Sequence, residues 1–394
     1  MFGMSLEEHI TAEALCEGLG VGSDIINFAH APGTRVVFGP GSVSGVGELS
    51  RELGGNRALI VTDPGIADAG HAEWVMSSLS ASGLETFVFL EVNENPTTED
   101  VARCVEVARS ESVDILIGLG GGSSMDTAKG CNFILTNGGK MKDYWGSGKA
   151  TKEMLPLVAI PTTAGTGSEC QSFALIADAK THMKMACGDR KAAARVAILD
   201  PELTLTQPSS VTAHTGIDAL THAIESAVCK SRTPVSSSYS RLAFALLNDG
   251  FEGVVKDPGS LACRAKVQLG AAYAGVAIEN SMLGAAHAAA NPLTAHCGVV
   301  HGQAVGLMMP HVIEYNQADP EIRAIYSELY RGDLSLRVLE FLDMLGMAKG
   351  ISGFGIKEEL IHKMAEEAAS QWTAEFNPRG IGLEEFKALY NAAM

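Results

Sequence analysis

Four residues in the C-terminal half of the chain have the types and spacing of a metal site. Asp218 and His222 lie four positions apart in TGIDALTHAIE, so both side chains fall on one face of a helix. His287 in LGAAHAAANPLTA and His301 in VVHGQAVG follow, fourteen positions apart. One carboxylate and three imidazoles suit a divalent metal such as Fe(II) or Zn(II).

The surroundings of Asp218 support this interpretation. A carboxylate buried on an apolar helix costs several kcal/mol unless it is paired or bound to a metal. No Lys or Arg lies between Pro201 and Lys230 to pair with it locally. We expect Pro292, a helix breaker between His287 and His301, to fold the chain back and bring both histidines toward one point.

A glycine-rich turn in the N-terminal half is suited to phosphate binding. Gly121, Gly122 and Ser123 follow the apolar run 113–119 and open an expected helix from Ser123. Glycines let the backbone approach a pyrophosphate, and the start of a helix attracts its charge. The turn is not GxGxxG, and on its own it could be only a tight turn that needs positive φ angles.

A second loop, IPTTAGTGSE, follows the apolar run 155–160. Its hydroxyls and glycines could donate to phosphate or nicotinamide oxygens, although a polar loop with local turns would look similar. Asp63 ends the run ALIVTD, where an acid can bind a ribose hydroxyl and repel the 2′-phosphate of NADP. The alternative is a purely structural role, in which Asp63, Pro64 and Gly65 form a turn. Asn95, in another turn, is a further candidate ligand.

The elements that must position these residues alternate in the first half and are helical in the second. Apolar strands are expected at 34–39, 57–63, 85–92, 113–119, 155–163 and 196–201. Alternation with helices, as at 72–83 and 97–111, predicts a parallel sheet covered on both faces. Helices are then expected at 211–229, 234–250, 258–279, 281–290, 301–315, 319–328, 335–346, 356–370 and 382–393.

These patterns divide the chain into an N-terminal extension (1–27), a dinucleotide-binding α/β domain (28–201) and an all-α metal-binding domain (202–394). The 394 residues are long enough for two large cores, with 46% hydrophobic residues and 43 glycines. Only 19% are charged, which indicates extensive burial or an oligomer interface, so we expect a homo-oligomer.

Charge and cysteine usage exclude several classes of protein. A net charge of −17 argues against nucleic acid and against anionic membranes as partners. No apolar run approaches the ~20 residues that span a bilayer, and the acidic N-terminus is unlike a signal peptide. Eight scattered cysteines suggest reduced thiols, and a cytoplasmic location is expected.

Five motifs together resemble the iron-containing (group III) alcohol dehydrogenases. They are GGGSSMDTAKG, IPTTAGTGSE, GIDALTHAIE, AAHAAANPL and HGQAVGLMMPHV, in the family's order and at similar spacing from about residue 28 to the C-terminus. The resemblance implies a Rossmann-like dinucleotide-binding domain and a helical metal domain, in the dehydroquinate synthase-like architecture. It also implies reversible conversion of an alcohol to its aldehyde or ketone by hydride transfer at nicotinamide C4, with the metal acting as a Lewis acid.

The family's functional residues carry over to this chain position by position. The metal ligands fall on Asp218, His222, His287 and His301. The cofactor contacts fall on Asp63, Asn95, Gly121, Gly122, Ser123, Thr162, Thr163, Thr166 and Lys184. An aspartate at position 63 goes with NAD rather than NADP in this family.

One position departs from the family. Many members have a histidine four residues after the third ligand, where this chain has Asn291. Asparagine cannot act as a general acid near neutral pH, although it can donate hydrogen bonds. Water, a ribose hydroxyl or His296 could then handle the proton.

Other functions remain possible for these motifs. A metal- and NAD-dependent lyase of the dehydroquinate synthase type shares the architecture, but its phosphorylated substrate calls for Lys and Arg that 202–229 lack. A reductase specific for an anionic aldehyde is another alternative, with Arg379 as a conceivable clamp. A binding paralogue would have lost metal ligands, and an NAD sensor would need a further effector region.

Overall fold

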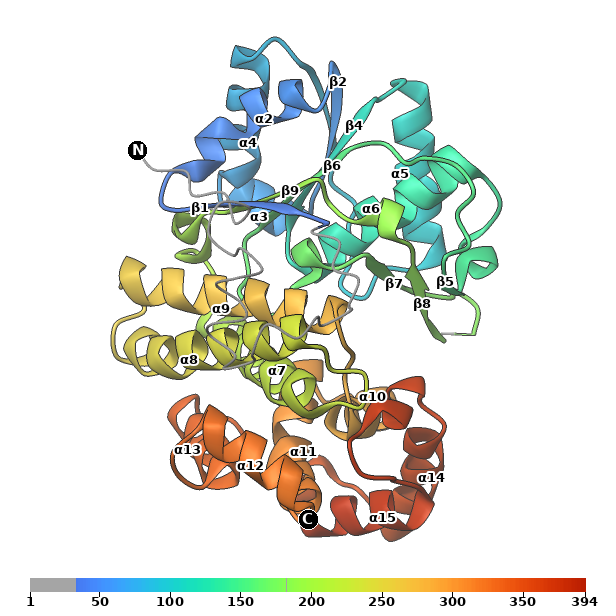
Figure 1. The fold of residues 1–394 in the computed structure, drawn as a ribbon. Helices are drawn as coiled ribbons and strands as arrows, with labels where there is room; N and C mark the ends of the chain where they lie inside the picture. Colours follow the sequence, from blue (N-terminus) through green and yellow to red (C-terminus); the bar gives the residue numbers. More distant parts are fainter. Residues whose placement is uncertain (1–32, 182) are drawn as a thin grey trace, which may run out of the picture. The chain divides into compact units, whose positions relative to one another are not determined.

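The computed structural model describes residues 33–181 and 183–394 (Figure 1). The predicted extension 1–27 lies outside these residues. Backbone contacts group the described chain into two units, residues 33–163 with 167–207, and residues 164–166 with 208–394. The sequence placed one boundary after Pro201, and its assignment of functional domains remains a prediction.

The first unit is built on a parallel sheet. Its six strands are β1 (Arg35–Phe38), β2 (Arg57–Val61), β3 (Glu85–Phe89), β4 (Ile115–Gly120), β6 (Leu157–Pro161) and β9 (Val196–Leu199). They lie in the order β1-β9-β6-β4-β2-β3, and every pairing is parallel. These strands confirm the predicted parallel sheet, each within a few residues of its expected position.

Helices cover both faces of this sheet because alternate strand residues point to opposite sides. Leu59 and Leu116 pack in one core with α5 (Thr98–Ser110) and α6 (Gly122–Asn137). Ile60 and Ile117 pack in another core with Val46 and Val75. The last two residues belong to α2 (Val46–Glu52) and α4 (His71–Ala81). Strands buried on both sides explain why their sequences are apolar throughout.

A small second sheet in this unit was not predicted. It consists of β5 (Gly146–Ser147), β7 (Phe173–Ala177) and β8 (Lys184–Gly188), with β7 and β8 antiparallel. It was not predictable from the sequence because these strands have five residues or fewer and the polar stretch 178–183 obscures the alternation. Strand β8 begins at Lys184, which is one of the predicted cofactor contacts.

The described part of the second unit is helical. Its α-helices are α7 (Ser209–Val228), α8 (Pro234–Lys256), α9 (Leu261–Glu279), α10 (Ala285–Cys297), α11 (His301–Asn316), α12 (Pro320–Leu329), α13 (Leu334–Met344), α14 (Glu358–Ala369) and α15 (Leu383–Ala392). One apolar core contains residues from all of them. The predicted helices are confirmed, and only that expected at 281–290 is displaced.

That displacement corrects the expected role of Pro292. Pro292 lies inside α10, which continues to Cys297, so it does not reverse the chain. The reversal occurs at Gly298, whose φ of 65° ends the helix in the left-handed conformation before α11 begins at His301. Glycine adopts this conformation without the steric cost of a Cβ, and this turn joins the helices that carry His287 and His301.

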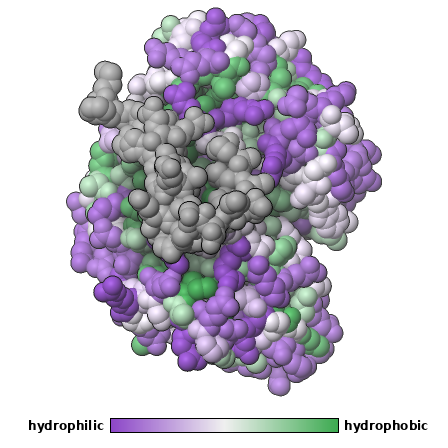
Figure 2. Space-filling view, viewed as in Figure 1, coloured by the Kyte–Doolittle hydropathy of each residue, from purple (hydrophilic) through white to green (hydrophobic). Residues whose placement is uncertain are grey.

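Hydrophilic residues are widely distributed over the described part of the face shown in Figure 2. Among the described residues, no helix is both long enough and apolar enough to cross a membrane.

Candidate active site

The carboxyl ends of four neighbouring strands carry most of the predicted cofactor residues. Asp63 follows β2, Gly121 follows β4, Thr162 follows β6 and Asn95 follows β3. The strand order reverses between β2 and β4, because β3 lies on one side of this pair and the later strands lie on the other. Open α/β sheets bind ligands in the crevice at such a switch point.

Asp63 borders the glycine turn. It is the N-cap of α3 (Pro64–Asp68), and its Oδ1 accepts a hydrogen bond of 3.1 Å from the Ile66 amide. Its Oδ2 faces the turn, 3.7 Å from where a Cβ at Gly120 would lie. Asp63 can therefore form the turn and also bind a ligand. Its Oδ1 caps the helix, and its Oδ2 faces the glycine turn.

The glycine turn presents a helix start at the same edge. Gly121 is the N-cap of α6, and Gly122 and Ser123 are its first residues. The Thr162 amide donates to Gly120 O at 2.9 Å, which holds the second loop against the turn. A Cβ at Gly121 would meet only Thr163, at 3.5 Å. Within the described part of the chain, the buried Oγ1 of Thr162 has no hydrogen-bond partner, so this hydroxyl can serve a ligand.

Asn95 and Lys184 form a second part of this edge. Lys184 Nζ donates to Asn95 Oδ1 at 3.5 Å, and Asn95 has a φ of 54°. Ala177 of β7 donates its amide to Pro96 O, which ties this turn to the small sheet. Thr166 differs from the other predicted contacts because its loop, 164–166, groups with the helical unit, where a Cβ at Gly165 would clash with Thr215.

A buried polar cluster contacts the second loop (161–169) at Ser168, and the sequence analysis did not identify this cluster. Lys129 on α6 is completely buried, and its Nζ donates to Ser168 O at 2.6 Å and Phe173 O at 3.0 Å. Ser168 Oγ donates to Asp126 Oδ1 at 2.8 Å. Burial raises the pKa of Glu169 to about 7, against the lowering effects of its own backbone amide and of Lys129.

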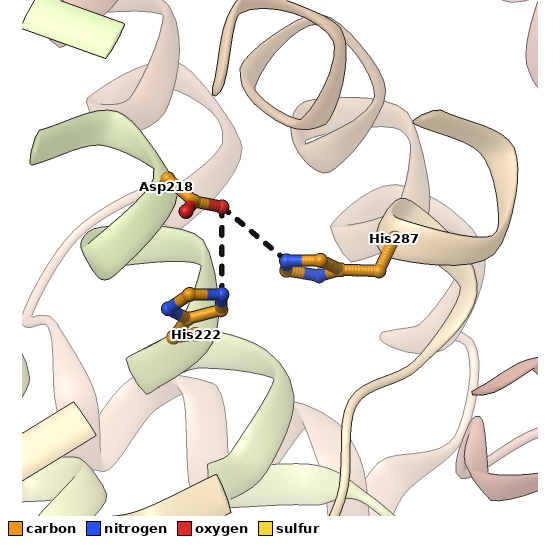
Figure 3. Close-up of side chains that lie close together, drawn as sticks. All are labelled: Asp218, His222 and His287. Carbon is orange, nitrogen blue, oxygen red and sulfur yellow. Dashed lines mark ion pairs between the residues drawn. The ribbon is translucent and has the colours of Figure 1, made fainter. Parts of the chain in front are cut away.

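In the second unit, three predicted ligands converge on one point (Figure 3). Asp218 and His222 project from α7 and His287 from α10, and one potential ligand atom of each lies within 4.8 Å of the others. His222 Nε2 and His287 Nε2 both lie 3.4 Å from the same oxygen, Asp218 Oδ1. His301, the first residue of α11, places its Nε2 3.8 Å from that oxygen.

These distances fit a divalent metal. In a tetrahedral shell with bonds of about 2.1 Å, ligand atoms lie about 3.4 Å apart. Asp218 Oδ1 and His287 Nε2 are buried and have no hydrogen-bond partner among residues 33–181 and 183–394, and a shared cation would supply one. The His301 side chain is 39% exposed, whereas the other three are 7% exposed or less. His301 is therefore the most exposed of the four predicted ligands.

Burial and neighbouring charges shift the pKa values of the three buried ligands in different directions. Burial lowers the pKa of His222 to about 4, although the charge of Asp218 opposes this. Burial also disfavours the charged form of His287, but Glu225 and Asp218 outweigh it and raise the pKa of His287 to about 9. Burial alone would raise the pKa of Asp218, but the three histidines, chiefly His222, hold it well below its usual range.

Glu225 contacts one of the predicted metal ligands, and the sequence analysis did not identify it. It lies on α7 seven residues after Asp218, and its Oε2 is 2.6 Å from His287 Nδ1. Two turns of a helix bring positions i and i+7 to one face, so the final Glu of TGIDALTHAIE was the available signal.

The accessory candidates have other partners. Asn291 lies one turn after His287 on α10, and its Nδ2 donates to Gln371 Oε1 at 3.1 Å. His296 lies nine residues after His287, on the opposite face of α10, and its Nε2 is 2.7 Å from Glu367 Oε2. The structure therefore does not bring His296 to the four predicted ligands.

Arg379 is also engaged within the unit. Its guanidinium lies over the Tyr315 ring, 4.0 Å from the centroid, and donates to Tyr315 O. This engagement weighs against Arg379 as a clamp for an anionic substrate.

A doubly wound parallel sheet followed by a helical unit defines the dehydroquinate synthase-like architecture. Residues 33–201 match the model of the iron-containing alcohol dehydrogenase family, and residues 212–394 match the model of the C-terminal domain of the Fe-containing alcohol dehydrogenases. The chain therefore belongs to the iron-containing alcohol dehydrogenase family.

Several known proteins are similar to this chain over nearly its full length. The NAD-dependent methanol dehydrogenase of Bacillus methanolicus is 33% identical, over 93% of this chain and 100% of its own. The sulfoacetaldehyde reductase of Bilophila wadsworthia is 31% identical, over 93% of this chain and 98% of its own. A 1,3-propanediol oxidoreductase structure superposes with a TM-score of 0.89 at 31% identity, covering 94% of this chain and 100% of its own.

The family establishes the reaction class. The chain is an oxidoreductase of the alcohol–aldehyde class, as the sequence predicted. The family implies NAD and an iron-type metal. These findings decide against the lyase alternative.

Proposed function

We propose that this chain interconverts a small, uncharged alcohol, primary or small secondary, and its aldehyde or ketone, with NAD(H) and a divalent metal. Asp218, His222, His287 and His301 would hold Fe(II), with Zn(II) as the alternative. The observation that carries this proposal is the convergence of three imidazole Nε2 atoms on Asp218 Oδ1, at 3.4, 3.4 and 3.8 Å.

The metal would supply Lewis acidity toward the substrate oxygen, and the nicotinamide would supply or accept the hydride. The protein's own contribution is positioning. Two buried helices fix three of the four ligands, so little reorganisation is needed on binding. His301, at the exposed start of α11, completes the set on the side from which substrate can arrive.

For the cofactor, we propose that the pyrophosphate binds at the start of α6, against Gly121, Gly122 and Ser123. Thr162, Thr163 and Thr166 would offer hydroxyls or amides, and Asn95 and Lys184 would contact the cofactor beyond β3. Asp63 Oδ2 would accept from a ribose hydroxyl and repel a 2′-phosphate, so NAD is preferred to NADP. The support is that these strand ends flank the switch point of the sheet.

No side chain on α10 is proposed to relay the substrate proton. Asn291 does not titrate near neutral pH, and its amide is bound to Gln371. His296 is directed to Glu367. Proton exchange with water or through a ribose hydroxyl is the proposed route.

A neutral substrate is favoured over an anionic aldehyde because Arg379 is occupied by Tyr315. The test is to load metal-free protein with Fe(II) or Zn(II), and to follow NADH and NADPH absorbance with a panel of small neutral aldehydes and sulfoacetaldehyde. Stoichiometric NADH consumption that requires metal is expected. Equal turnover after chelation would refute the metal's role, and a strong preference for sulfoacetaldehyde would refute the neutral substrate.

We further propose a cytoplasmic homo-oligomer. The seven described cysteines are all free, as expected in a reducing compartment. The low share of charged residues, 19%, suits additional burial between copies. Light scattering at several protein concentrations would test this, and a monomer throughout would contradict it.

A further inference from the structure

One buried carboxylate near the predicted metal ligands has no part in the function proposed above. Glu225 is 3% exposed, and its two oxygens receive three hydrogen bonds. Oε1 accepts from the Ala286 amide at 2.6 Å. Oε2 accepts from the Gly284 amide at 3.0 Å and lies 2.6 Å from His287 Nδ1. Every partner belongs to the start of α10.

Two of these bonds replace a missing helix cap. α10 begins after Gly284, which has no side chain to cap it, and the amides of Gly284 and Ala286 would otherwise lack acceptors. The carboxylate supplies them from α7. Gly284 leaves room for this approach, since a Cβ there would lie only 3.0 Å from Glu225 Oε1. Glu225 therefore fixes the backbone at the turn that carries His287.

The third bond determines which ring nitrogen carries the proton. An ionised carboxylate only accepts hydrogen bonds, so at 2.6 Å the Nδ1 of His287 must donate. In a neutral ring the Nε2 lone pair is then free, and this atom lies 3.4 Å from Asp218 Oδ1. This is the tautomer that a metal at the predicted site requires.

We propose that Glu225 is a positioning residue, which holds His287 as the Nδ1–H tautomer with Nε2 aimed at the metal site. This inference rests on the metal site of the proposed function. Charge supports it as well. His287 lies between two buried carboxylates, Asp218 and Glu225, whose two negative charges would balance a divalent cation bound to the neutral ring.

The test is Glu225→Gln, which keeps the volume and removes one acceptor. Both oxygens of Glu225 face donors, so the new NH2 group must face one in either orientation. At the Oε2 position it would favour Nδ1 as an acceptor and move the proton to Nε2. We expect the Zn(II) affinity of metal-free protein, measured by chelator competition, to fall by about 10–100-fold. Glu225→Asp, which keeps the charge but shortens the reach, should lose less.

A matched control is Glu169→Gln, which removes an equally buried carboxylate (3% exposed) from the other unit. This variant should keep a Zn(II) affinity within about twofold of wild type, because none of the four predicted metal ligands contacts Glu169. A folded Glu225→Gln protein with wild-type affinity would overturn the proposal. If the wild type itself failed to bind Zn(II), the proposed function would fail instead.

A second measurement needs no variant at position 225 and so does not depend on its folding. In Zn(II)-loaded wild-type protein, ¹⁵N-histidine spectra should show the His287 ring proton on Nδ1, assigned by its loss in His287→Asn. A ring proton on Nε2, or zinc bound through Nδ1, would overturn the inference.

Discussion

The rings of His222 and His287 are stacked, with centroids 4.8 Å apart and planes inclined by 16°. Two imidazolium ions at this separation would repel each other, so at most one can be charged. Burial, with a smaller effect of His287, lowers the pKa of His222 to about 4, whereas Glu225 and Asp218 outweigh burial and raise the pKa of His287 to about 9. A cation bound to both rings would allow both to be neutral while they remain stacked. Substitution of either histidine should therefore weaken metal binding.

His222→Ala should lose bound metal and turnover while remaining folded. One of the four predicted ligands is removed from a helix whose backbone bonds stay intact, so circular dichroism should be unchanged. Metal content should fall below a tenth of the wild-type value, and turnover with it. His296→Ala is the matched control, since that histidine pairs with Glu367 on the other face of α10. Stoichiometric metal in His222→Ala would contradict the ligand assignment.

Asp63→Ser should relax the preference for NAD. Serine can still cap α3, so the bond to Ile66 is replaced and stability should change by less than about 1 kcal/mol. Loss of the charge should raise the ratio of kcat/KM for NADPH to that for NADH by at least about tenfold, equivalent to about 1.4 kcal/mol. Initial rates with both cofactors measure this ratio.

The control for this effect is Asp333→Ser, which alters an N-cap aspartate of α13 that has no predicted cofactor role. It should leave the cofactor ratio unchanged. An unchanged ratio in Asp63→Ser as well would remove Asp63 from the proposed ribose site.

Gly121→Ala should weaken cofactor binding without unfolding the protein. The added methyl would meet only Thr163, at 3.5 Å, and the φ of Gly121 is −84°, which alanine adopts readily. A pyrophosphate against this turn would be pushed away, so we expect at least about a tenfold rise in the Kd for NADH and a Tm within a few degrees of wild type. Fluorescence titration with NADH would measure it, and wild-type affinity would argue against this turn as the phosphate site.

The sequence predicted the elements and the ligands whose signals are local. The spacing of Asp218 and His222 within one helix, and the apolar strands followed by polar turns, were sufficient. Contacts between distant segments were not predictable. Glu225 is 62 residues from His287, and Lys129 is 39 from Ser168, so these two pairings could not be derived from one sequence, although the helix position of Glu225 could. Pro292 was misread because tertiary packing retains a helix that propensity alone would end.

The buried acid of the second loop gives a prediction about pH. Burial raises the pKa of Glu169 from 4.5 to about 7, so its native form is neutral at acidic pH. The stability that this gives is fully present below the unfolded pKa and is lost as pH rises through about 7. The shift corresponds to at most about 3 kcal/mol. Glu169→Gln, which is always neutral, should not lose this contribution.

The difference in Tm between Glu169→Gln and wild type should therefore grow in favour of the variant from about pH 5 to about pH 8. Thermal unfolding of metal-free protein in a buffer series measures it. Glu153→Gln removes a carboxylate whose side chain is 82% exposed and should show no such trend. Parallel Tm curves for Glu169→Gln and wild type would mean that Glu169 is already ionised in the folded protein at pH 5, held so by Lys129 despite its burial.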